Sequence, residues 1–103
     1  MQRNREDSEL LNASQLKTVV LNAVHNGSTL IDPQCKAQMQ QQGIDDSDLV
    51  RSLEYGNYNS PPVWVPNLHS WMYSVVGKNL DGDLLKIFLT VDEFRLTIRD
   101  VAK

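Results

Sequence analysis

The chain has 103 residues, of which 41% are hydrophobic and 22% are charged, and its formal net charge is −3. These values are typical of one globular domain and exclude a disordered chain, which lacks enough apolar material to offset the entropy of folding. The single cysteine, Cys35, excludes an internal disulfide and a cysteine-rich metal site and suits a reducing compartment. The acidic balance counts against a general nucleic-acid-binding role, because such proteins draw affinity from basic residues.

No repeat, long linker or low-complexity stretch divides the sequence. The charged start, MQRNREDSEL, lacks the apolar core of a secretory signal, and no apolar run approaches the roughly 20 residues that span a bilayer. We therefore expect a single cytoplasmic domain over residues 1–103, with residues 1–7 flexible, and no membrane association.

The first half of the chain carries the signals of two or three helices. Apolar residues recur there at spacings of three and four, which is the stripe of an amphipathic helix. An Asp-Pro pair and a cluster of acidic residues are typical N-terminal caps and indicate the starts of two further helices. The expected helices run from Ser8 or Ser14 to about His25, from Asp32-Pro33 to about Gln42, and from the cluster Asp45–Asp48 to Gly56.

The second half changes to alternation of apolar and polar residues, which indicates strands. The pair Asp81-Gly82 predicts a hairpin turn, because it tolerates positive φ angles. The expected strands are Val63–Val65, His69–Val76, Asp83–Val91 and Phe94–Val101. Helices followed by an antiparallel meander of three to four strands indicate an α+β fold.

Three cations stand on the last two expected strands. The alternation places Lys86, Arg95 and Arg99 on one face of the sheet, with Phe88 and Thr97 between them. Cations with an interleaved aromatic ring can bind a phosphate backbone and a stacked base. The alternative is a solvated face whose charges keep the sheet soluble.

Other candidate residues each have a functional and a structural reading. His69, at the start of a strand, is a candidate for proton transfer or a surface residue. The cluster Asp45–Asp48 resembles half of a metal loop, but helix capping explains it without a ligand, and we expect no metal or cofactor. Tyr58 and Trp64 are either core aromatics or exposed anchors of a binding surface. Cys35 suits a small buried role better than that of a reactive thiol.

Two segments resemble a known group of proteins. Residues 34–56, QCKAQMQQQGIDDSDLVRSLEYG, resemble the opening H-A-x-x-R-M-x-x-R-G-I of an uncharacterised group related to the RelE, BrnT and MqsR toxins. The later YSVVGKNLDGDLLKIFLTVDEFRLTIRDV is similar to the strand pattern of that group, so the resemblance covers roughly residues 30–102. Its most specific anchors are Met39, Gly43, Ile44, Gly56, Tyr73 and Gly77.

The resemblance implies a RelE-like fold and a link to metal-independent ribonucleases that cut messenger RNA and are neutralised by a protein antitoxin. This sequence departs from the motif at three positions. Its histidine aligns with Gln34, and its two arginines align with Gln38 and Gln42. Glutamine can form hydrogen bonds, but it neither acts as a base near neutral pH nor carries positive charge.

Two hypotheses follow from these observations. In the first, the protein is a non-enzymatic or degenerate relative of RelE-like toxins that binds a protein partner, either antitoxin-like or a target, through its acidic first half and the loop aromatics. In the second, it binds or cleaves RNA: Arg95 and Arg99 position phosphate, Lys86 offsets developing charge, and His69 or Tyr73 transfers a proton. We favour the first hypothesis for activity and toxin-like ancestry for the fold.

Overall fold

The computed structural model describes residues 10–92 and 95–103, so the expected flexible segment 1–7 and Phe94 lie outside the described residues. The α+β class is confirmed. Along the chain the elements are α1 (Ala13–Asn26), β1 (Thr29–Ile31), α2 (Pro33–Gln41), α3 (Asp46–Tyr55), β2 (Val63–Val65), the 3-10 helix η1 (Pro66–Leu68), β3 (Ser70–Lys78), β4 (Leu84–Asp92) and β5 (Arg95–Ala102).

The sheet has the strand order β1-β5-β4-β3-β2. Strands β2 to β5 form the expected antiparallel meander. The sheet nevertheless has five strands rather than three or four, because β1 joins it in parallel beside β5, with Leu30 opposite Thr97. A strand of three residues between two helices is too short to produce a recognisable alternation in the sequence.

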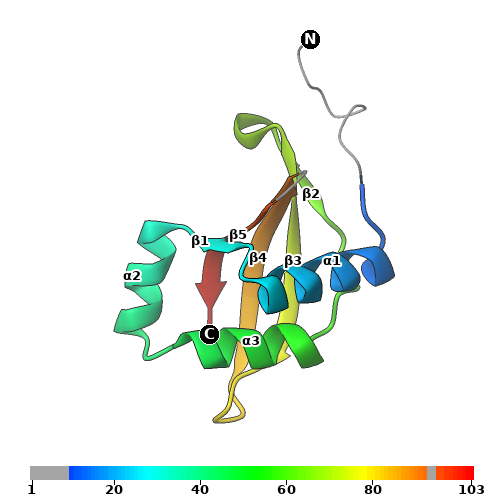
Figure 1. Ribbon diagram of the computed structural model, residues 1–103. Coiled ribbons are helices and arrows are strands. Elements are labelled where there is room, and N and C mark those ends of the chain that lie inside the picture. The colour runs from blue at the N-terminus through cyan, green and yellow to red at the C-terminus, as the bar shows by residue number, and fades with distance from the viewer. Residues whose placement is uncertain (1–9, 93–94) are drawn as a thin grey trace.

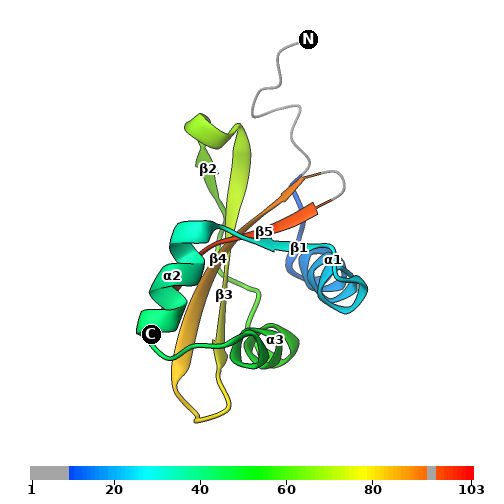
Figure 2. The ribbon, with the colours of Figure 1, turned by 60° about the vertical axis from the view of Figure 1, so that its left-hand side comes forward.

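The helices lie on one side of the sheet and at one of its edges. Figures 1 and 2 show α1 and α3 across one face, whereas α2 stands beside β5. Strand β1 pairs only with the first half of β5, at Leu96 to Ile98, so α2 packs against β5 where β1 does not. In the described part of the chain, no helix is long and apolar enough to cross a membrane.

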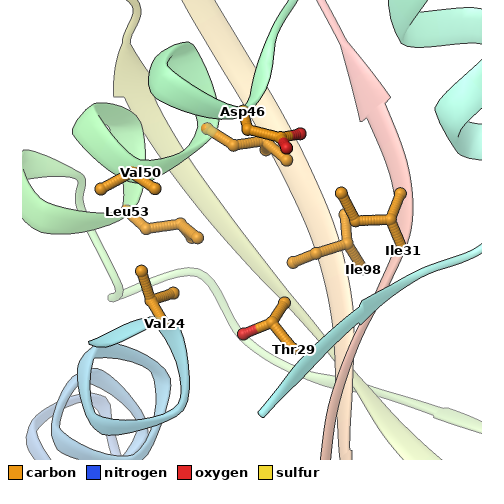
Figure 3. A pocket seen from close by; sticks show the side chains of 8 residues that line it. Val24, Thr29, Ile31, Asp46, Val50, Leu53 and Ile98 are labelled. Atoms are coloured by element: carbon orange, nitrogen blue, oxygen red, sulfur yellow. The ribbon is translucent and has the colours of Figure 1, made fainter. Parts of the chain in front are cut away.

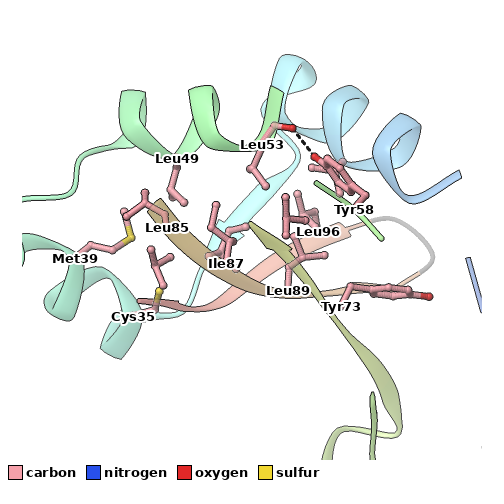
Figure 4. Close-up of a cluster of buried hydrophobic side chains, with 14 of the residues drawn as sticks. Cys35, Met39, Leu49, Leu53, Tyr58, Tyr73, Leu85, Ile87, Leu89 and Leu96 are labelled. Carbon is pink, nitrogen blue, oxygen red and sulfur yellow. Dashed lines mark hydrogen bonds between the residues drawn. The ribbon is translucent and has the colours of Figure 1, made fainter. Parts of the chain in front are cut away.

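The core fills the space between the sheet and the helices (Figure 4). Cys35 and Met39 insert into it from α2, one turn apart, so the structural reading of Cys35 is confirmed. Burial raises the pKa of the Cys35 thiol, and the carboxylates of Asp100 and Asp32 raise it further. The other buried hydrophobic residues are Leu16, Val20, Ile44, Leu49, Leu53, Tyr58, Tyr73, Val75, Leu85, Ile87, Leu89, Leu96, Ile98 and Val101.

The acidic cluster before α3 caps that helix, as the structural reading predicted. Asp45 accepts a hydrogen bond from the amide of Asp48, and Asp48 accepts one from the amide of Asp45. Asp48 is buried and also accepts a hydrogen bond of 3.1 Å from the amide of Leu80, in the turn between β3 and β4. These amide donors lower the pKa of the Asp48 carboxyl group. The side chain therefore joins the start of α3 to the distant end of the sheet.

Candidate binding face of the sheet

One face of the sheet carries neither α1 nor α3 (Figure 2), and we call it the open face. Side chains alternate between the faces of a strand, so the residues that pair with Phe88 and Lys86 share their face. It combines apolar and cationic side chains that are mostly exposed or half-buried. The open face consists of Val63, Val65, Met72, Ser74, Val76, Lys78, Leu84, Lys86, Phe88, Thr90, Asp92, Arg95, Thr97, Arg99, Asp100 and Ala102.

A β-bulge in β5 shapes the centre of this face. The register between β4 and β5 shifts after Phe88: Phe88 pairs with Asp100 and Leu89 with Ile98, so Arg99 is an extra residue without a partner in the ladder. Strict alternation would have turned Asp100 toward the helices and Val101 toward solvent. With the bulge, Val101 is buried in the core and Asp100 stays exposed. The extra residue thus keeps a charge out of the core and places Arg99 over the neighbouring strand.

Two of the three predicted cations are held in place by their neighbours. The Nε of Arg99 donates a hydrogen bond of 3.0 Å to the hydroxyl of Thr90, which is buried. The Nζ of Lys86 lies 5.3 Å from the centre of the Phe88 ring, a cation–π arrangement. These contacts agree with the sequence prediction that Lys86 and Arg99 lie on the same face of the sheet.

These cations have no carboxylate partner among residues 10–92 and 95–103. The ion pair found there joins Lys103 to Asp83 at 3.9 Å, away from Lys86 and Arg99. The open face carries four cations, Lys78, Lys86, Arg95 and Arg99, against the two carboxylates of Asp92 and Asp100. The face is thus net positive, although the protein as a whole is net negative.

The cations are spread along the sheet. Arg95 pairs with Asp92, and Lys86 lies six residues before Asp92 on the same strand. At about 3.3 Å per residue, Lys86 and Arg95 stand on the order of 20 Å apart. Such spacing suits an extended ligand and does not concentrate charge at a single reacting atom.

The structure places the two predicted proton-transfer residues away from Lys86 and Arg99. Tyr73 belongs to the buried cluster on the helix side of the sheet (Figure 4), and its hydroxyl oxygen accepts a hydrogen bond of 3.0 Å from the amide of Leu11. His69 is exposed in the connection between β2 and β3, with a left-handed backbone at φ 47°. Hence Tyr73 and Lys86 lie on opposite faces, and His69 stands at a tip of the molecule.

The three motif positions occupied by glutamine lie together on α2. Gln34, Gln38 and Gln42 follow one another at intervals of four residues, and all three are exposed. They form a stripe beside the one that Cys35 and Met39 bury. The positions that carry charge in the motif that this segment resembles are therefore uncharged and open to solvent here.

The aromatic surface that the protein-binding hypothesis placed in the loop is not present as expected. Tyr58 is buried, and its hydroxyl donates a hydrogen bond of 2.6 Å to the carbonyl of Leu53 at the end of α3. Trp64 is half-buried and packs edge-on against Trp71, with ring centres 5.5 Å apart. The reading of Tyr58 as an exposed anchor is therefore wrong, because its ring completes the core.

Several residues of the open face were not identified from the sequence. Met72, Val76 and Lys78 extend the face onto β3, beside Thr90 and Lys86 of β4. The available signal was the alternation from Met72 to Lys78, but apolar residues occupy both faces of β3 and mask it.

Comparisons with protein families, with curated proteins and with solved structures found no match to this chain.

Proposed function

We propose that this protein is a non-enzymatic binding protein related to RelE-like toxins, and that it binds an acidic protein partner on the open face of its sheet. The observation that carries the proposal is the pair Lys86 and Arg99. Both stand on a face that α1 and α3 leave uncovered, beside apolar side chains, and neither has a carboxylate partner in the described residues. A ligand with carboxylates and apolar side chains complements both properties of this surface.

The arrangement favours binding over catalysis. General acid–base catalysis needs a titratable group within hydrogen-bond reach of the reacting atoms. Tyr73 is buried on the opposite face, and His69 lies in the exposed connection between β2 and β3, outside the contacts described for Lys86 and Arg99. The glutamines at positions 34, 38 and 42 supply no base or cation either.

RNA binding is the second candidate, favoured by one specific contact. The Lys86 ammonium over the Phe88 ring places a cation and an aromatic surface side by side, as single-stranded RNA requires for its phosphate and base. In that case Arg95 and Arg99 position further phosphates along the strand. Among the described residues, Phe88 is the single aromatic ring on this face, and for that reason we rank RNA second.

A titration followed by NMR tests the proposal and separates the candidates. The labelled protein is mixed with a short peptide of alternating glutamate and leucine, or with single-stranded RNA of equal charge. We expect the peptide to shift amide signals of β3, β4 and β5. The double variant Lys86→Gln/Arg99→Gln should weaken its binding about tenfold, because two charged contacts are lost.

The matched control is Lys17→Gln/Lys36→Gln, which changes the net charge equally but lies on the helices. It should leave peptide binding within about twofold of the unaltered protein. Tighter binding of RNA than of the peptide favours the second candidate, and messenger integrity in a cell-free translation reaction then decides between binding and cleavage. Binding of neither ligand to the open face overturns both.

A further inference from the structure

A small cavity remains open where α1, α3 and the two strands β1 and β5 meet (Figure 3). Its volume is about 170 Å³. The floor is formed by core residues from α3 and β5, namely Leu49, Leu53 and Ile98, which are buried. Half-buried Val24, Ile31 and Val50 form the rim. The cavity is therefore an apolar hollow, lined from four elements, that continues the core toward the surface.

Two polar groups lie in this apolar surround. The hydroxyl oxygen of Thr29 is inaccessible to solvent and has no hydrogen-bond partner in the described part of the chain. Figure 3 shows it turned from β1 toward Val24. A hydroxyl without a partner in an apolar site carries a free-energy cost that a ligand with a donor or acceptor can remove.

The second polar group is the carboxylate of Asp46, on the α3 side of the cavity. The neighbouring carboxylates of Asp45 and Asp48 are occupied in the capping box of α3. Asp46, in contrast, is exposed and makes no ion pair or side-chain hydrogen bond with the described residues. The cavity thus has one negative charge at its opening that no described residue of the chain neutralises.

We propose that this cavity binds a small primary amine with a compact apolar body, such as a phenyl ring or a branched aliphatic chain. The volume suits that body, because an apolar cavity of roughly 150 Å³ is large enough to hold benzene. The Asp46 carboxylate pairs with the ammonium group, and the Thr29 hydroxyl oxygen accepts a hydrogen bond from the same group, which has donors only. The open face of the sheet takes no part, so this site is independent of the proposed binding function.

Benzylamine is the probe for the first test, with benzyl alcohol and benzoate as neutral and anionic ligands of the same shape. An NMR titration of the full chain should show benzylamine shifting the amide signals of Val24, Thr29 and Val50. The dissociation constant for so small a ligand is expected on the order of 1–10 mM. Benzyl alcohol should bind about two- to fivefold more weakly, as expected for losing one exposed ion pair, and benzoate more weakly still.

Variants test which residues bind the ammonium group of the ligand and which bind its apolar body. Asp46→Asn should lower the affinity for benzylamine to that for benzyl alcohol, whereas the matched control Glu54→Gln, two turns along α3, should leave it unchanged. Val50→Phe fills the hollow from its rim and should abolish binding of both ligands. Should Val50→Phe fail to fold, Thr29→Val has nearly the same shape and should weaken benzyl alcohol binding through the lost hydroxyl alone.

Three results overturn the proposal: amide shifts outside the cavity, equal affinities for benzylamine and benzoate, or benzylamine binding that is unaffected by both Asp46→Asn and Val50→Phe. A tripeptide beginning with phenylalanine also carries an ammonium group and a phenyl ring. Tighter binding of that tripeptide than of benzylamine would assign the cavity to a polypeptide amino terminus in place of a free amine.

Discussion

The backbone of Ser52 in α3 lies directly against Gly77 in β3. A methyl group on Gly77 would overlap the carbonyl oxygen of Ser52 and come within 3.0 Å of its Cα atom. A methyl group on Gly56, the residue that follows the same helix, would likewise overlap the Ser52 carbonyl oxygen and come within 2.7 Å of the Val75 side chain. Two glycines thus let α3 approach the sheet more closely than a side chain would permit.

Gly77→Ala should therefore destabilise the protein. The new methyl group meets backbone atoms of α3, which cannot move aside as a flexible side chain can, so we expect a loss of about 2–3 kcal/mol in the free energy of unfolding. Urea unfolding measures it. Lys78→Ala, at the next and exposed position, should change stability by less than about 0.5 kcal/mol. Equal stability of the two variants would contradict the close approach.

Asp48→Asn should remove part of the acid sensitivity of the fold. Its folded-state pKa is lowered by the amides of Asp45 and Leu80, so the carboxylate stabilises the protein above its unfolded pKa of about 4. That contribution is lost as the pH falls through the folded-state pKa. Urea unfolding across this pH range should show the variant less stable at neutral pH but with a shallower decline in acid. Parallel curves would count against this assignment.

Tyr58→Phe tests the opposite end of the pH scale. Burial raises the pKa of the Tyr58 phenol. Its contribution to folding stability is therefore complete below its pKa in the unfolded chain, about 10, and is lost as the pH rises further. The variant should lose about 1 kcal/mol at neutral pH, because the Leu53 carbonyl loses its donor. The difference in unfolding free energy between the two proteins should then shrink above about pH 10. A constant difference would show that Tyr58 ionises freely.

A pair of aromatic variants separates the two faces of the sheet. Tyr73→Phe removes the acceptor of the Leu11 amide and should lower stability by about 1 kcal/mol without changing binding of the acidic peptide. Phe88→Ala should weaken that binding about fivefold or more, since it removes the half-buried ring beside Lys86. Binding that depends on the Tyr73 hydroxyl and not on Phe88 would place the ligand on the helix side of the sheet and contradict the proposal.

The parts of the fold that could be predicted from the sequence are those with strong local signals. Asp32 before Pro33 and the pair Asp45 and Asp48 marked the starts of α2 and α3, because caps act through their nearest backbone amides. The regular alternation of β4 likewise predicted which side of it faces the core, with Ile87 buried between Lys86 and Phe88. Each of these features depends on residues a few positions apart.

The features that could not be predicted depend on distant contacts. Strand β1 has only three residues and is held by pairing with β5, far along the chain. The bulge at Arg99 follows from burying Val101, and Tyr58 is buried because its hydroxyl reaches the Leu53 carbonyl. The cavity between α1, α3, β1 and β5 exists only once these elements have packed together, so no short sequence motif predicts it.

The two edges of the sheet limit how a partner can attach. Strand β2 has three residues, and Pro61, Pro62 and Pro66 flank it without backbone donors. Strand β1 is equally short and ends just before Pro33. Edges of this kind discourage another chain from extending the sheet as an added strand. At these two short strands another chain has little backbone to pair with, so we expect an acidic partner to contact the open face through its side chains.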